Sequence, residues 1–101
     1  MKKLIILYKK PADAEAFMEY YTSTHLPLVN KIPGLVRTEL TRIERTLLGE
    51  QEFFLLAELI FADIDTFRTA MKSPENAATG ADLANFADGL ATVMTGEELE
   101  L

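Results

Sequence analysis

Residues 52–61 read EFFLLAELIF, an almost unbroken apolar run in which Glu58 is the only charge between Phe53 and Phe61. The run is bounded and short, which favours a β-strand. A strand that is apolar on both sides must be covered on both faces, as a central strand of a sheet is. We therefore predict a sheet that has residues 52–61 near its centre.

The preceding part of the chain supplies another strand and a helix. Residues 3–9, KLIILYK, are a short apolar run flanked by lysines, which is typical of a strand. Because Pro27 does not fit a helix interior, a helix capped by Asp13 should end near His25, and a second helical turn should begin at Pro27. Apolar side chains recur at three- and four-residue steps along this region, as on one face of an amphipathic helix: Phe17, Tyr20, Tyr21 and Leu28.

The remaining segments complete an alternating pattern. Residues 35–45 mix Val, Thr and Ile with charges and predict an edge strand. Asp63 and Ser73 can each cap a helix, the second of which is weakened at Gly80. A last strand is expected after Gly89.

The resulting order, β-α-β-β-α-β, predicts an α+β, ferredoxin-like fold in a single domain, residues 1–101. Right-handed crossovers place both helices on one face of a four-stranded antiparallel sheet, with strands 3–9 and 52–61 at its centre. Both central strands are apolar on both sides, and the helices cover only one face. Soluble monomers rarely expose an apolar face of this kind, so we predict a homodimer with the two sheets packed face to face.

Composition excludes several classes of function. Ten Lys and Arg against sixteen Asp and Glu give a net charge of −6, which argues against nucleic acid or an anionic membrane as partner. The chain has no Cys and one His, so thiol catalysis and sites with two imidazoles are excluded within one chain. No stretch has the features of a signal peptide or a membrane-spanning helix, and no nucleotide or zinc motif is present, which predicts a cytoplasmic protein without a cofactor. Haem ligation by His25 stays open at this point.

The most unusual string is YYTSTHLPL, residues 20–28, which gathers two phenols and the only imidazole. Tyr21 and His25 are four residues apart and therefore neighbours on a helix. An imidazole takes and gives protons near neutral pH, and a phenol beside it can hold a substrate oxygen, so His25, Tyr21 and Tyr20 are candidate catalytic residues. The alternative is that the tyrosines are aromatics at the edge of the core and that His25 caps backbone carbonyls.

Glu58 is the second candidate for catalysis. A carboxylate in a dry central strand has a raised pKa and can act as acid or base. One register of the hairpin would place Glu58 opposite Thr38, and other registers would pair it with Arg37 or Arg42. The alternative is a structural hydrogen bond or ion pair.

The same residues carry a family resemblance. The pattern Tyr-Tyr-x-x-x-His-x-Pro-Leu, followed five residues later by Pro-Gly-Leu, spans residues 20–35 and resembles the EthD family of the dimeric α+β barrel superfamily. The later strings FRTAMKSPE, from residue 67, and ADLANFAD also fit this family. The resemblance implies ferredoxin-like subunits whose sheets close into a barrel between two chains, and it matches His25 to the family's signature histidine.

Similar proteins include dehydratases and cyclases of aromatic polyketides and cofactor-free monooxygenases, and the family is often labelled oxidoreductase. We therefore expect a small-molecule enzyme that performs proton transfer or cofactor-independent oxidation on an aromatic or enolisable compound. His25 would be its acid/base, in an apolar cleft whose walls are Tyr8, Phe17, Tyr21 and Leu28. The alternative is a dimer that binds a small apolar or aromatic metabolite without turnover.

Overall fold

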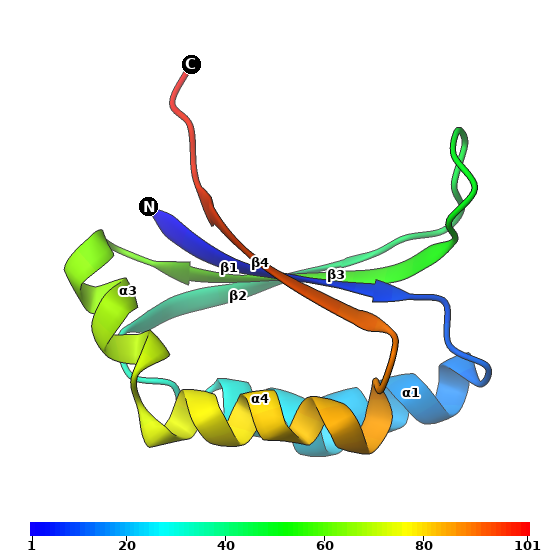
Figure 1. Cartoon of the computed structure of the whole chain (residues 1–101), viewed down its shortest axis with the longest axis horizontal. Helices are drawn as coiled ribbons and strands as arrows, with labels where there is room; N and C mark the ends of the chain where they lie inside the picture. The colour runs from blue at the N-terminus through cyan, green and yellow to red at the C-terminus, as the bar shows by residue number, and fades with distance from the viewer.

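The sheet orders its four antiparallel strands β2-β3-β1-β4 (Figure 1). The computed structural model describes residues 1–101. As predicted, the first and third strands lie in the centre and the more polar second strand lies at an edge. The strands are β1 (Lys2–Lys9), β2 (Leu35–Arg42), β3 (Phe53–Phe61) and β4 (Ala91–Glu97).

The helices lie against one face of this sheet (Figure 1). They are α1 (Ala14–Tyr20), the π-helical turn η1 (Tyr21–His25), α2 (Leu26–Val29), α3 (Ile64–Met71) and α4 (Pro74–Phe86). The predicted caps are confirmed, because the side chains of Asp13, Asp63 and Ser73 each accept the backbone N–H three residues further on. No helix has the length and apolar character that crossing a membrane requires.

The core lies between the helices and the sheet. Alternate residues of the two central strands point into it, with Tyr8, Ala57 and Phe61 fully buried. Their neighbours, Ile5 and Leu56 among them, belong to the opposite face, which we call the outer face. It also carries Leu7 of β1 and the 40% exposed Met94 of β4, and no element of the chain covers it.

Three details differ from the sequence prediction. Helical structure continues through the expected break before Pro27, because η1 joins α1 to α2. The second strand ends at Arg42 rather than at residue 45. A register shift between Leu35 and Arg37 moves the hairpin by one position, so that Glu39, not Thr38, lies opposite Glu58.

Candidate functional site

The π-helical turn positions the only imidazole of the chain. Pro27 lacks a backbone N–H, and its ring would clash with the carbonyl four residues earlier in a regular α-helix. Widening the turn avoids this clash, and Leu26 N–H bonds the carbonyl of Tyr21, five residues back. Tyr21 and His25 remain on one side of the turn, with ring centroids 5.3 Å apart, and both are buried.

A carboxylate from a distant part of the chain meets this turn. Asp82 of α4 places Oδ2 2.9 Å from Nδ1 of His25. Its Oδ1 accepts hydrogen bonds from the hydroxyl of Tyr20 at 2.6 Å and from the amide of Asn85 at 2.9 Å. His25 is 3% and Asp82 7% exposed, so one buried carboxylate links α1, η1 and α4.

The surroundings set the protonation of this pair. Burial raises the pKa of Asp82, but hydrogen bonds from Tyr20, Asn85 and His25 outweigh burial and hold its pKa below the ordinary value. Burial lowers the pKa of His25, and Asp82 offsets only part of that effect. At neutral pH Asp82 is therefore an anion, which can only accept, and Nδ1 of His25 carries the ring proton. The lone pair of His25 is left on Nε2.

His25 lines a cavity of about 280 Å³ between the helices and the sheet. Most of its wall is apolar, supplied by side chains such as Leu59, Val29 and Leu83. Gly80 of α4 and Val93 of β4 are the exposed members of the lining and mark the mouth of the cavity.

Two phenol side chains line the same cavity. The hydroxyl of Tyr8 is buried and has no hydrogen-bond partner in the protein. Burial, with Tyr21 and Asp82 nearby, raises the pKa of Tyr8 above its usual range, and burial raises the pKa of Tyr21 to about 12. Both phenols stay protonated at neutral pH and are available as hydrogen-bond donors. Buried polar atoms without a hydrogen-bond partner are rare in folded proteins. A ligand bound in the cavity would provide the missing partner for the hydroxyl of Tyr8.

The structure gathers some of the sequence candidates and separates others. Tyr8, Tyr21 and His25 meet at the cavity, and Tyr20 lies behind it, bonded to Asp82. Phe17 was expected as a wall but packs in the core behind Tyr8, with ring centroids 5.3 Å apart.

Two further expectations do not fit the geometry. Leu28 lies outside the cavity, beside a shallow hollow next to Pro74, and Val29 takes its place in the wall. Glu58 points to the outer face, where it forms an ion pair with Lys3 at 2.9 Å rather than with Arg37 or Arg42. It cannot act on a ligand beside His25, because the sheet lies between them.

Sequence reasoning missed Asp82 and Asn85. A signal was present, because a carboxylate three residues after Thr79 and four before Phe86 falls on the packed face of α4. Lys, Glu, Arg and Asp are seldom fully buried unless they are paired, so an acid on such a face predicts a partner. Only the tertiary structure shows that the partner is His25.

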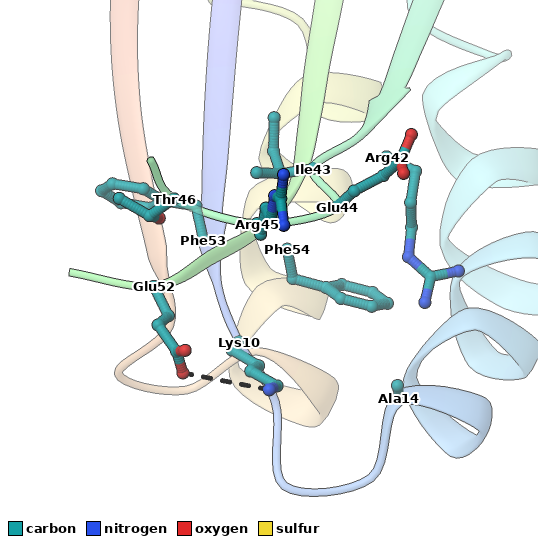
Figure 2. Close-up of a pocket in the computed structure, with 10 residues that line it drawn as sticks. All are labelled: Lys10, Ala14, Arg42, Ile43, Glu44, Arg45, Thr46, Glu52, Phe53 and Phe54. Carbon is teal, nitrogen blue, oxygen red and sulfur yellow. Dashed lines mark ion pairs between the residues drawn. The ribbon is translucent and has the colours of Figure 1, made fainter. Parts of the chain in front are cut away.

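A larger hollow of about 700 Å³ lies at the end of the sheet where β1 and β2 finish and β3 begins (Figure 2). Arg42 is the last residue of β2, Arg45 lies in the segment after it, and Lys10 follows β1. The guanidinium of Arg42 lies 4.4 Å from the centre of the Phe54 ring. Nowhere in the chain do three His, Asp or Glu side chains gather in a way that could hold a metal ion.

Distant solved structures share the fold. A dimeric ferredoxin-like protein of unknown function from Thermobifida fusca has a TM-score of 0.67 at 15% identity, covering 96% of this chain and 90% of its own. SnoaB from Streptomyces nogalater, a cofactor-independent oxygenase, has a TM-score of 0.60 at 20% identity, covering 94% of this chain and 87% of its own.

Two relatives are much closer in sequence. An EthD family protein of Bacillus halodurans is 44% identical, with a TM-score of 0.89 over 98% of this chain and 99% of that one. An uncharacterized 11.0 kDa protein from the thcB–thcC intergenic region of Rhodococcus erythropolis is 36% identical over 98 residues, 97% of this chain and 95% of that protein. Residues 9–90 also match the EthD domain. The chain therefore belongs to the EthD family.

Proposed function

We propose that this protein is a small-molecule enzyme in which His25 removes a proton from an aromatic or enolisable substrate. The observation that carries the proposal is the buried His25–Asp82 pair at the wall of an apolar cavity. A histidine whose lone pair is fixed by a carboxylate is the arrangement that general base catalysis uses. An apolar cavity with a few convergent polar groups is typical of small-molecule sites.

The residues divide the work as follows. Asp82 holds the Nδ1 proton of His25, so Nε2 takes the proton of the substrate, and the resulting imidazolium is stabilised by the carboxylate. The substrate becomes an enolate or phenolate. The hydroxyl groups of Tyr8 and Tyr21 would donate hydrogen bonds to its oxygen as negative charge develops there.

The cavity limits the class of substrate. Its volume of about 280 Å³ lies at the lower end of the range for ligand sites, and most of its lining is hydrophobic. A compact one- or two-ring compound with one acidic O–H or C–H suits it. Deprotonation of an electron-rich phenol is also the first step in its oxidation by molecular oxygen, which would accept the electrons, so cofactor-independent oxidation is compatible with the same groups. SnoaB shows that this fold can carry such chemistry.

Deuterium exchange measures the proposed proton transfer directly. We expect the protein to catalyse exchange at the acidic C–H of 2-tetralone in D₂O, followed by NMR. His25→Gln should abolish the catalysed rate, and Asp82→Asn should lower it by about 10²-fold, as loss of a general-base arrangement does. Asp65→Asn, which removes an exposed carboxylate, is the matched control. Binding of 2-tetralone with no exchange above background would contradict catalysis and identify a binding protein instead.

We also propose that the protein is a homodimer whose outer faces pack against each other. The outer face leaves Met94 40% exposed and Ile5, Leu7 and Leu56 only partly buried. A second sheet packed about 10 Å away would cover these side chains. The protein of this fold from Thermobifida fusca is dimeric, which supports a dimer here.

A further inference from the structure

The His25 cavity extends along β1 and α4, and its reactive groups lie at one end. Both elements run in the same direction, from the α3 side of the molecule toward α1 (Figure 1). The end of α4 lies beside these groups, because the ring centroid of Phe86 is 6.0 Å from that of Tyr8 and 4.7 Å from that of His25. Leu4 and Asn76, near the starts of β1 and α4, line the same cavity. Asn76 therefore marks the end away from His25.

A largely apolar wall separates the two ends. Asn76 and Leu83 are the first and last residues of α4 in the lining, seven positions apart, or about 10 Å along a helix. Between them, Thr79 donates its hydroxyl proton to the carbonyl of Glu75 at 2.9 Å, so this proton is not available to a ligand. Across the cavity the sheet contributes apolar side chains such as Leu59. Asn76 is thus the only polar side chain at that end of the lining whose groups are free to bind.

The protein itself holds the amide of Asn76 only weakly. Its Nδ2 lies 3.4 Å from the carbonyl oxygen of Met71, beyond the usual range of about 2.7–3.2 Å, and 3.9 Å from the weakly accepting sulfur of the same residue. Its Oδ1 accepts no hydrogen bond from the chain and is not sealed inside the core. A half-buried amide oxygen in this position can accept a hydrogen bond from a ligand hydroxyl.

The charge of the lining decides what kind of group fits there. No Lys, Arg, Asp or Glu side chain lines the cavity, so a charged ligand group would be buried without a partner, at high cost. We infer that the substrate is a two-ring compound with an oxygen at each end: one held by the phenols beside His25, and the other a neutral hydroxyl that donates to Oδ1 of Asn76. This inference rests on the proposed function and narrows its substrate class.

Three tetralones test this second contact. In 6-hydroxy-2-tetralone the hydroxyl lies at the end opposite the carbonyl, in 5-hydroxy-2-tetralone it lies at the side, and 2-tetralone has none. Exchange into D₂O gives kcat/KM for each, divided by the uncatalysed rate because the hydroxyl changes the acidity of the C–H. We expect the 6-hydroxy compound to exceed both others at least fivefold. The gain should lie in KM, since the contact with Asn76 is present before and during proton transfer.

Substitution of Asn76 assigns the preference to its amide. In Asn76→Leu, which keeps the size of the side chain, the ratio of the 6-hydroxy compound to 2-tetralone should fall to about one. Asn76→Ala adds no bulk and should give the same result, and thermal melting shows that each variant is folded. Ala77→Leu, at an exposed position of α4, is the matched control and should keep the wild-type ratio.

The outcomes separate this inference from the proposed function. Equal kcat/KM for the three compounds, or a preference that survives both substitutions of Asn76, would overturn the inference and leave catalysis by His25 standing. Absence of exchange with all three compounds would contradict the proposed function. Calorimetric affinities of the same compounds would then decide the contact with Asn76 by the same ratios.

Discussion

At the scale of single residues, the hydroxyl of Tyr8 is unfavourable for folding but suited to hydrogen bonding with a ligand. It is buried beside the His25–Asp82 pair and unpartnered in the protein. Leaving a buried polar group without a hydrogen bond costs about 1–3 kcal/mol. A ligand oxygen would satisfy it, so the proposed function explains why this unfavourable group is present.

Tyr8→Phe should therefore stabilise the empty protein and weaken its function. We expect the melting temperature to rise by several degrees, at about 4–8 °C per kcal/mol for a domain of this size. Exchange into 2-tetralone should slow at least tenfold. Tyr21→Phe is the comparison, because its hydroxyl is not among the buried, unpartnered atoms. Loss of stability in Tyr8→Phe would show that the hydroxyl has a structural partner.

The pH dependence of stability follows from the lowered pKa of His25, whose main cause is burial. Above the unfolded pKa of about 6.5, His25 is neutral in both the folded and the unfolded chain. In that range it does not make the free energy of unfolding depend on pH. As pH falls below 6.5, the unfolded chain takes up a proton that the folded chain resists, so the free energy of unfolding decreases. Below the folded pKa, His25 is protonated in both states and causes no further decrease in the free energy of unfolding.

Urea unfolding between pH 7.5 and 5 measures this effect. We expect the wild type to lose stability across that window and His25→Gln to lose measurably less. The loss of stability that belongs to Asp82 lies lower: it begins as pH falls toward the unfolded pKa of about 3.9 and ends below the folded pKa, which hydrogen bonds hold down. Equal slopes for wild type and His25→Gln would mean that His25 titrates normally.

At the scale of elements, local signals predicted nearly every strand and helix, because caps and apolar periodicity are properties of neighbouring residues. The π-helical turn was not predicted, since a proline usually signals a break and the alternative depends on how Tyr21 and His25 pack. The hairpin register stayed open because it depends on an irregularity between Leu35 and Arg37. The pairing of His25 with Asp82 spans 57 residues and could not be read from spacing.

Gly80 lies inside helix α4, where a glycine lowers stability by an amount that can be measured. Glycine inside a helix destabilises it by roughly 0.5–1 kcal/mol relative to alanine. Packing does not require it here, because a Cβ at this position would meet nothing within 4 Å. Its place at the cavity mouth opposite Val93 offers a functional reason: a small residue keeps the mouth open.

Gly80→Ala should therefore raise stability by about 0.5–1 kcal/mol with little effect on binding. Gly80→Leu should weaken binding of 2-naphthol, followed by its fluorescence, at least fivefold more than it weakens binding of phenol. Ala81→Leu, on the exposed side of α4, is the matched control. Equal affinities in Gly80→Leu and Ala81→Leu would place the mouth elsewhere.

At the scale of the whole molecule, the two faces of the sheet carry different features: one borders the cavity and the other carries the proposed interface. Helices and β-sheet enclose the His25 cavity on one face, and every group of that site comes from one chain. The other face carries the apolar side chains of the proposed interface around the Lys3–Glu58 ion pair. Sequence patterning predicted this division, because two helices cannot cover both faces of a sheet whose central strands are apolar throughout.

Leu56→Lys tests the division in one variant. The substitution places a charge on the outer face while the helix-facing side of β3 is unchanged. We expect sedimentation at 10 µM to show a folded monomer where the wild type is a dimer, because burying an unpaired charge opposes association. Thr69→Lys, at an exposed position of α3, should leave the protein dimeric. Exchange into 2-tetralone should persist in the folded monomer, since His25, Asp82 and both phenols belong to one chain. Loss of exchange in a monomer that still unfolds cooperatively would show that the second copy contributes to the site.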